Sequence, residues 1–153
     1  MAFFLKLDDS FEKTIEVIQH EAGGHGFAKL ADEYNYSGTL SSMDKDKINA
    51  NSPLGWYSNI DLTPDPAKIK WSWFLADDRY KDEVGVIEGG YTYQYGVWRP
   101  TENSIMKNNS AGYFNAPSRY TIWNRIHKLA YGKEWTGTYE DFAKYDAINR
   151  KTP

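Results

Sequence analysis

The stretch QHEAGGHGFAKLADEY, residues 19–34, decides what can be predicted for this chain of 153 residues. It places two histidines, His20 and His25, five residues apart, with Glu21 directly after the first. In the metal-binding pattern H-E-x-x-H the histidines are four residues apart, so a regular helix presents both imidazoles on one face. A spacing of five places them about 140° apart around the helix axis, too far for one metal ion to reach both.

A local widening of the helix would return the two imidazoles to one face. Gly23 and Gly24 lie between the histidines, and glycine permits backbone conformations that other residues resist. A π-bulge absorbs one extra residue in a helix and often occurs at functional sites. We therefore predict a π-bulge at residues 22–24.

The helix that carries this motif is predicted over residues 10–27. Asp9 and Glu12 have the spacing of a capping box, and Ser10 is the alternative N-cap. Four apolar residues then recur at helical spacing, as is typical of a face that packs against a core. They are Phe11, Ile15, Ile18 and Ala22.

A carboxylate beyond the helix would complete a metal site. Asp32 and Glu33 follow the second histidine within reach, with Tyr34 beside them. Two histidines, a carboxylate and an open fourth position are typical of catalytic zinc. Asp32 has fewer rotamers to fix, and we expect Glu33 to point the opposite way and to accept a hydrogen bond from a histidine N–H. Glu33 remains the alternative ligand, and histidines that face solvent or make local hydrogen bonds remain the alternative to a metal site.

The middle of the chain is predicted to be mostly irregular around one hairpin. Residues 35–70 are rich in Asn, Ser, Asp and Pro, with a short helix at 42–49. Alternating residues over 84–98 predict two strands around Glu88-Gly89-Gly90. Residues 99–117 have the composition of turns.

Two helices are predicted near the C-terminus. The first follows Pro117, ends before Gly132 and carries an apolar face. That face consists of Tyr120, Trp123, Ile126 and Ala130. The second begins after Thr138, whose spacing to Asp141 is that of a capping box, and runs to about residue 147. His127 is predicted to be a surface or packing residue. No repeat or linker divides the chain, so we predict one domain over residues 1–153.

The composition excludes several classes of protein. With no cysteine, the chain has no disulfide scaffold and no thiolate metal site, which leaves histidine and carboxylate as zinc ligands. A net charge of −3 without a basic block argues against nucleic acid as partner, and no apolar run approaches the roughly 18 residues of a membrane span. Aromatic residues make up 16% of the chain and suit a folded domain with a peptide or sugar groove. The opening MAFFLKLDDS lacks the features of a signal peptide.

Four segments in the same order resemble the catalytic domain of the IgA-peptidase family of zinc metallopeptidases, including its variant with histidines five residues apart. The segments are HEAGGHGFAKLADEY (20–34), GVIEGGY (85–91), GVWRPTENSIM (96–106) and FNAPSRYTIWNRI (114–126). The resemblance implies an α+β fold that is the C-terminal portion of a zincin or metzincin-like catalytic domain. Its expected parts are a long zinc-binding helix, a β-hairpin, a Met-turn and C-terminal helices, with the N-terminal sheet largely missing.

The resemblance also implies a role for several residues. The implied zinc ligands are His20, His25 and Asp32, with Glu33 as the rival third ligand. Glu21 would be the general base for one catalytic Zn²⁺, and Met106 would lie under the metal in the Met-turn. Three further residues are candidates for oxyanion or substrate contacts, with packing or loop anchoring as the alternative for each. They are Tyr34, Arg99 and Tyr113.

The expected function is therefore that of a zinc endopeptidase acting on a protein or glycoprotein. By the same resemblance the protein is expected to be secreted or at the cell surface. Two alternatives remain open: a non-catalytic module that binds glycan or peptide on its aromatic side chains, and a truncated, inactive peptidase that still binds zinc.

Overall fold

The N-terminal helix changes its hydrogen-bonding pattern along its length. In the computed structural model, which describes residues 11–150, α-helix α1 (Phe11–Ile18) passes directly into a π-helix, η1 (Gln19–Ala28). The predicted helix is present, and the predicted widening extends over ten residues instead of one turn. The helix ends at Lys29, which is left-handed (φ 59°) and donates its N–H to the carbonyl of Gly24. The predicted N-caps, Asp9 and Ser10, lie outside the described residues.

The apolar face predicted for this helix is exposed, which corrects the expectation from periodicity. Phe11, Ile15 and Ile18 are 76%, 38% and 44% exposed. These three residues lie in the regular α-helical part, where no residue is buried, so the face marked by the 3.6-residue pattern is not one that the described part of the fold covers. The buried face lies in η1 instead and comprises His20, Gly24 and Ala28.

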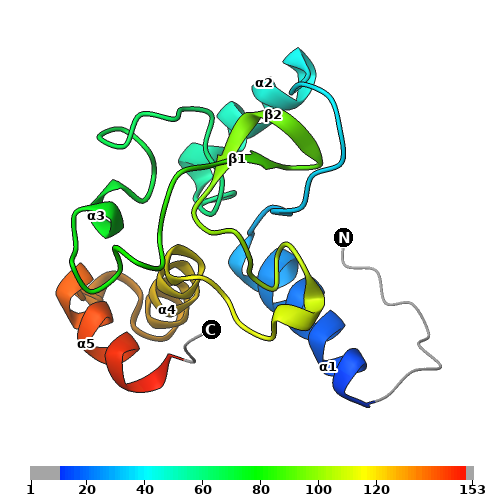
Figure 1. The fold of residues 1–153 in the computed structure, drawn as a ribbon. Helices are drawn as coiled ribbons and strands as arrows, with labels where there is room; N and C mark the ends of the chain where they lie inside the picture. The colour runs from blue at the N-terminus through cyan, green and yellow to red at the C-terminus, as the bar shows by residue number, and fades with distance from the viewer. Residues whose placement is uncertain (1–10, 151–153) are drawn as a thin grey trace.

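Four α-helices and three 3₁₀ turns follow the π-helix and make up most of the remaining regular structure of the described residues (Figure 1). The α-helices are α2 (Ser42–Asn51), α3 (Ser72–Leu75), α4 (Ala116–Tyr131) and α5 (Tyr139–Asn149), and single 3₁₀ turns are η2 (Ser52–Leu54), η3 (Asn109–Ala111) and η4 (Gly132–Glu134). The short helix predicted at 42–49 is α2. The predicted capping box of α5 is present, since Thr138 and Asp141 each accept a hydrogen bond from the other's backbone N–H.

Helix α4 is present, and Tyr120 and Trp123 of its predicted apolar face pack in the core, but the second half of that face does not. It begins at Ala116, and Pro117 occupies the first turn, where a missing N–H has no cost. Trp123 is 7% exposed, whereas Ile126 is 49% exposed and Ala130 is also exposed. His127 is partly buried in this second half, because the Trp135 ring folds back and stacks on its imidazole with centroids 4.3 Å apart. His127 is therefore a packing residue, as predicted.

The hairpin pairs β1 (Ile87–Gly90) with β2 (Tyr93–Arg99), and its turn is not at the predicted place. The two turn residues are Tyr91 and Thr92, with left-handed φ of 52° and 72°, and the Gly-Gly pair belongs to the strand. Tertiary bonds hold this turn: Tyr91 N–H donates to the carbonyl of Asp32 at 2.8 Å. Gly89 lies in β1 and is required for a different reason. A Cβ at this position would lie 3.0 Å from the side chains of Arg99 and Asn35.

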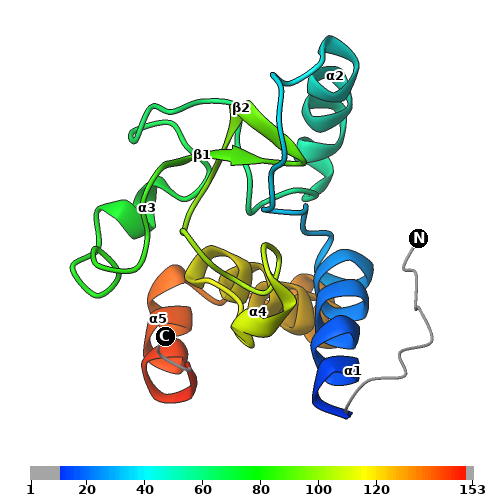
Figure 2. The same cartoon turned by 45° about the vertical axis from the view of Figure 1, so that its right-hand side comes forward.

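The residues after η1 run alongside the hairpin and join the two ends of the fold. Asn35 and Thr39 form isolated bridges with Thr92 and Tyr95, and Asp61 bridges Trp98. The hairpin and α2 lie at one end of the molecule, and α1, α4 and α5 lie at the other (Figures 1 and 2). This observed mixture of helices with a two-stranded sheet is an α+β arrangement.

One hydrophobic cluster, of Ala31, Ile48, Tyr57, Ile60 and Val97, joins α2 to the hairpin. Two further clusters position the elements around the histidines. The larger joins α3, α4 and α5 and contains Ile69, Trp71, Phe74, Tyr80, Val84, Ala116, Trp123, Phe142 and Ala143. The smaller lies under η1 and contains Ala28, Leu30, Ile105 and Met106. Among residues 11–150, no helix combines the length and apolar character of a membrane span.

Candidate metal centre

Three side-chain atoms from two segments meet at one point. His20 Nε2, His25 Nε2 and Asp32 Oδ1 are each 3.1 Å from the other two. His20 is 6% exposed, whereas the side chains of His25 and Asp32 are 25% and 23% exposed. The π-helical register of η1 places both imidazoles on one side, and the extended chain beyond Lys29 returns Asp32 to them.

Backbone carbonyls orient both imidazoles. His20 Nδ1 lies 2.7 Å from the carbonyl of Ile105, and His25 Nδ1 lies 2.8 Å from that of Leu30. Because a carbonyl only accepts, each Nδ1 carries a proton, and the Nε2 of each ring is the atom directed at the other two donors.

The three converging lone pairs fit a metal ion. Without a metal ion, these two imidazole nitrogens and the carboxylate oxygen, 3.1 Å apart, can be held together only by protons on the imidazole Nε2 atoms. An ion bound at about 2.0–2.2 Å in tetrahedral geometry needs donors about 3.3 Å apart, close to the observed separation. Nitrogen and oxygen donors with outward-facing Nδ1–H groups suit zinc. The residues present therefore fit a zinc ion with an open fourth position.

The segment that carries Asp32 is held from both sides. Its carbonyl accepts from Tyr91 N–H at the hairpin turn, and the next N–H, of Glu33, donates to the carbonyl of Met106 at 2.8 Å. In an extended chain successive side chains point in opposite directions. Asp32 therefore faces the histidines, and Glu33 faces the core.

Glu33 makes no contact with either histidine, which corrects the role predicted for it. It is fully buried (0% exposed), and its carboxylate accepts hydrogen bonds from three side chains. The donors are Asn59 (2.8 Å), Ser104 (2.6 Å) and Asn115 (2.8 and 3.0 Å). Burial raises the pKa of Glu33, against the opposing effect of these hydrogen bonds.

These three donors were not identified from the sequence as part of the site. Ser104 begins the turn around Met106, and Asn115 is the N-cap of α4. Asn59 also holds the backbone of Ala31 on both sides, by accepting from its N–H and donating to its carbonyl, each at 2.8 Å. Glu33 thus joins the ligand-bearing segment to the Met106 turn and to α4. No local sequence motif predicts this hydrogen-bond network, because the residues in it are 11 to 82 positions apart in the chain.

Met106 lies directly beneath the π-helix. It is fully buried, and a Cβ added to Gly24 would lie 2.3 Å from its sulfur. Gly24 is therefore required by close approach of the Met106 side chain to the helix backbone. The neighbouring Gly23 has only an ordinary 3.6 Å contact, with Phe114.

Glu21 and Tyr34 lie close enough to influence the donor group electrostatically. The charge of Glu21 raises the pKa of both His25 and Tyr34. No residue within 11–150 is a hydrogen-bond or ion-pair partner of the Glu21 carboxylate. The Tyr34 pKa is raised chiefly by burial and then by Asp32, so its hydroxyl stays protonated.

The donor group shifts the pKa values of its own members. Burial alone would raise the pKa of Asp32, but hydrogen bonds with His20, His25 and Tyr34 outweigh it and hold the pKa well below its usual range. Burial alone would lower the pKa of His25, but the hydrogen bond and charge of Asp32 raise it. The carboxylate is therefore ionised and ready to bind a cation.

Arg99 and Tyr113 do not point to the donor group. The Arg99 guanidinium is buried and donates to the carbonyls of Thr101, Glu88 and Gly89, so it anchors the hairpin. The Tyr113 hydroxyl donates to the carbonyl of Asn103 at 3.3 Å. For both residues the structure shows the loop-anchoring alternative.

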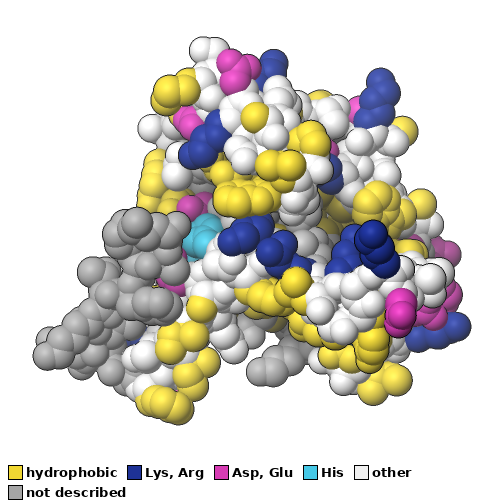
Figure 3. Space-filling view, turned by 180° about the vertical axis from the view of Figure 1, so that it is seen from behind, with side chains coloured by type: hydrophobic (Ala, Val, Ile, Leu, Met, Phe, Trp, Pro, Cys, Tyr) yellow, Lys and Arg dark blue, Asp and Glu magenta, His cyan; other side chains and the backbone are white. Residues whose placement is uncertain are grey.

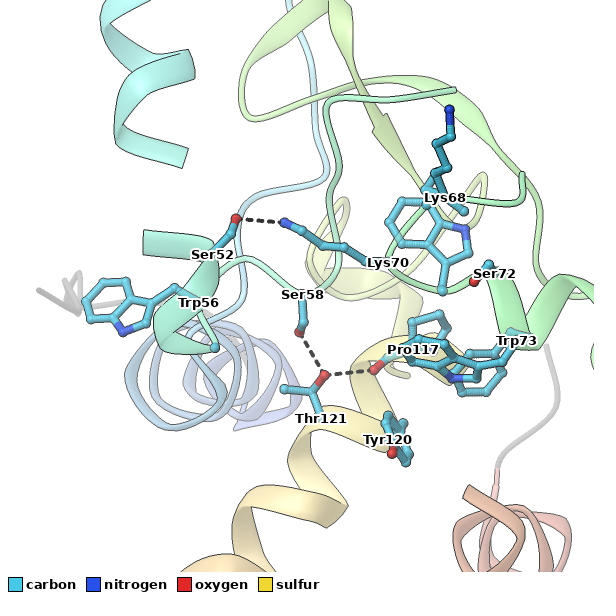
Figure 4. A pocket seen from close by; sticks show the side chains of 14 residues that line it. Ser52, Trp56, Ser58, Lys68, Lys70, Ser72, Trp73, Pro117, Tyr120 and Thr121 are labelled. Atoms are coloured by element: carbon cyan, nitrogen blue, oxygen red, sulfur yellow. Dashed lines mark hydrogen bonds between the residues drawn. The ribbon is translucent and has the colours of Figure 1, made fainter. Parts of the chain in front are cut away.

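Two cavities meet at Trp56. One, of about 440 Å³, includes His25 and Asp32 in its lining. The other, of about 410 Å³, has Trp56 at one end and Trp73 with Tyr120 at the other (Figure 4). On the face shown in Figure 3, histidine reaches the surface beside Lys or Arg side chains and below hydrophobic ones.

Residues 72–126 match the sequence profile of the family described as IgA Peptidase M64. The chain resembles this peptidase family. The match covers just over a third of the chain and includes the hairpin, Met106 and the first part of α4. The resemblance predicted from the sequence is confirmed over this segment, which begins after His20, His25 and Asp32. No individual curated protein gives a significant match to the chain.

Proposed function

We propose that this protein is a zinc-dependent endopeptidase of the zincin type. The observation that carries the proposal is the convergence of His20 Nε2, His25 Nε2 and Asp32 Oδ1 at 3.1 Å, with both Nδ1 atoms engaged by carbonyls. The similarity of residues 72–126 to a peptidase family supports a protein substrate.

Zinc bound by these three residues would lower the pKa of a water molecule and polarise the scissile carbonyl. The contribution of the chain is to hold the donors in place before any ion arrives. The carbonyls of Ile105 and Leu30 fix the two imidazole tautomers, and the Met106 side chain supports the helix at Gly24. Asp32 supplies the negative charge that favours a divalent cation.

Glu21 is the proposed general base. Its carboxylate would take a proton from the attacking water and deliver it to the nitrogen of the leaving amine as the C–N bond breaks. A base needs a free acceptor next to the reacting atoms, and Glu21 has no described partner that would occupy it. Tyr34 is the proposed donor to the negative charge that develops on the carbonyl oxygen, because its hydroxyl stays protonated near Asp32.

The conservative variant Glu21→Gln tests this assignment. We expect peptide hydrolysis to fall by roughly 10²–10⁴-fold, the usual contribution of a general base, while one zinc per chain remains bound. Glu16→Gln, on α1, is the matched control and should leave both quantities unchanged. Full hydrolysis by Glu21→Gln would remove Glu21 from the mechanism. One bound zinc without hydrolysis of any peptide by the wild type would support the inactive zinc-binding alternative.

A second candidate function is non-catalytic glycan or peptide binding, favoured by the cavity in Figure 4. Trp56 and Trp73 are 37% and 45% exposed, and hydroxyls of Ser58 and Thr121 lie between them. Exposed aromatic faces next to hydroxyl groups suit sugar rings. Binding of an oligosaccharide that persists in EDTA, is lost in Trp73→Ala and occurs without hydrolysis would favour this function over the peptidase.

A further inference from the structure

The cavity beside the donor group has an unusual backbone. Among residues 11–150 four residues other than glycine have left-handed φ, and three of them line this cavity. These are Lys29 (φ 59°), Tyr57 (φ 58°) and Tyr91 (φ 52°). Such conformations cost free energy and tend to persist at binding and catalytic sites.

Two of these backbones are bonded to the segment that carries the donors. Tyr57 N–H donates to the carbonyl of Lys29, and Tyr91 N–H donates to that of Asp32, both at 2.8 Å. The walls of the cavity therefore keep a constant position relative to the donor group. A substrate chain passing the donors would present a neighbouring side chain to this cavity.

The walls are aromatic. Trp56 and Tyr57 meet edge to face with centroids 5.9 Å apart, and Tyr57 and Tyr91 do so at 5.5 Å. Such walls favour the methylene groups of a substrate side chain through apolar contact. With a volume of about 440 Å³, the cavity has room for one side chain and its adjoining backbone.

Lys29 supplies the positive charge of the cavity, and the Asp32 carboxylate in the lining is already bonded within the donor group. The Lys29 ammonium lies over the Trp56 ring, 5.2 Å from its centroid, and no carboxylate within residues 11–150 forms an ion pair with it. The nearby acid Asp44 is already engaged by the hydroxyl of Tyr93 at 2.6 Å. A cation held by an aromatic ring beside apolar walls is complementary to a carboxylate carried on a short aliphatic stem.

We propose that this cavity selects a glutamate or aspartate side chain of the substrate next to the scissile bond, through the Lys29 ammonium and the walls formed by Trp56, Tyr57 and Tyr91. This inference rests on the proposed peptidase function for the direction of the substrate chain. It does not rest on hydrolysis for its test, because the cavity should discriminate between peptides by binding alone.

Equilibrium binding to the full chain, with zinc and in EDTA, tests the inference. The probes are blocked tetrapeptides that differ only at one position, which is Glu, Gln, Lys or Phe. Binding is measured from the NMR signals of the indole N–H groups. The variant Trp56→Phe assigns the Trp56 signal. We expect the Glu peptide to bind about five- to tenfold tighter than the Gln peptide and to shift the Trp56 signal. Lys29→Met, which keeps an unbranched side chain, should remove this preference, and Lys29→Glu should turn it toward the Lys peptide.

Lys45→Met, on the exposed surface of α2, is the control and should keep the wild-type preference. Equal affinity for Glu and Gln peptides, tighter binding of Phe, no measurable binding of any peptide, or an unchanged preference in Lys29→Met would each overturn the inference. Glu preference without hydrolysis would leave the cavity assigned and remove the peptidase proposal. Hydrolysis without a preference for the Glu peptide would leave the peptidase proposal standing and remove the assignment of the cavity.

Discussion

Single residues show where the candidate centre tolerates no change. A Cβ on Gly24 would collide with the Met106 sulfur, whereas a Cβ on Gly23, one residue earlier, would make only an ordinary contact with Phe114. We expect Gly24→Ala to destabilise the protein by about 1–3 kcal/mol through overpacking and to weaken zinc binding, because η1 must move away from the Met106 turn. Gly23→Ala should be neutral or stabilising by up to about 1 kcal/mol.

Chemical denaturation and zinc titration of the two alanine variants provide the comparison. The double variant Gly24→Ala with Met106→Ala should recover part of the zinc affinity, because the obstructing sulfur is gone. Equal behaviour of the two single variants would show that close approach at Gly24 does not set the geometry.

Asp32 and Glu33 are adjacent carboxylates with separate expected effects. Asp32→Ala should abolish most zinc affinity, because it removes one of the three donor atoms. It should keep the metal-free protein folded, because backbone bonds to Tyr91 and Met106 still hold the segment. Glu33→Ala should lower the free energy of unfolding by at least about 3 kcal/mol, because three buried side-chain donors lose their acceptor.

Isothermal titration with zinc and thermal melting of the metal-free variants separate the two effects. Loss of zinc affinity in a stably folded Glu33→Ala protein would make Glu33 the third ligand and would contradict the observed direction of the two side chains.

At the level of elements, the π-helix reconciles a five-residue spacing with one metal-binding face. Removing one of the adjacent glycines gives HEAGH, and deletion of Gly23 or Gly24 yields the same sequence. We expect the deletion to convert η1 to α-helical bonding and to retain zinc affinity within about tenfold, because four residues of α-helix also bring the imidazoles together. Insertion of an alanine beside Gly23 should abolish zinc binding.

Circular dichroism and zinc titration of the deletion and insertion variants check this expectation. Loss of binding in the deletion variant with normal folding would mean that the path of the backbone after His25, and not only the face of the helix, depends on π-helical bonding.

At the scale of the whole molecule, charged groups join α5 to the turn after α3. Asp77 accepts hydrogen bonds from Arg79 and from the Tyr139 hydroxyl, and Arg79 also pairs with Glu140. The hydrogen bonds from the Arg79 side chain lower the pKa of Asp77 to about 2, with a further contribution from the Tyr139 hydroxyl, and outweigh the opposing effect of burial. Its side chain is 12% exposed, so this linkage is only partly screened by solvent.

The pH dependence of stability follows from the sign of this shift. The folded pKa of Asp77 lies below the unfolded value, so its contribution is complete above about pH 4 and disappears as the pH falls through about 2. At pH 7 we expect Asp77→Asn to lose about 1–2 kcal/mol of unfolding free energy, and near pH 2 to equal the wild type. Urea denaturation across this range measures the difference. Asp78→Asn, with a 94% exposed side chain, should show none of it.

Much of the local structure was predictable because its causes are local. The capping residues of α5, the short helix at 42–49 and the helix after Pro117 follow from side chains that bond to backbone within one turn. The need for a widened helix followed from the His20–His25 spacing and the glycine pair between them. The secreted or cell-surface location and the single domain remain predictions.

Other expectations were wrong where distant segments override local preference. The hairpin turn formed at Tyr91–Thr92 instead of at the glycines, because backbone bonds to residues 32–36 hold two side-chain-bearing residues in left-handed conformations. The apolar residues of α1 and the residues Ile126 and Ala130 of α4 are exposed because no other described element covers them. Periodicity marks which residues share a face, but it does not say which face another element will cover.

The sequence by itself determined the candidate metal ligands: two histidines around Glu21, carboxylates within reach, and no thiol to compete for a metal. Only the tertiary structure decided between Asp32 and Glu33 as the residue that faces the histidines, and it assigned Arg99 to the hairpin. The physical reason is that direction in an extended segment alternates residue by residue, so the outcome depends on which side is anchored. Hydrogen bonds from Asn59, Ser104 and Asn115, up to 82 residues away, anchor Glu33 in the core and leave Asp32 facing the imidazoles.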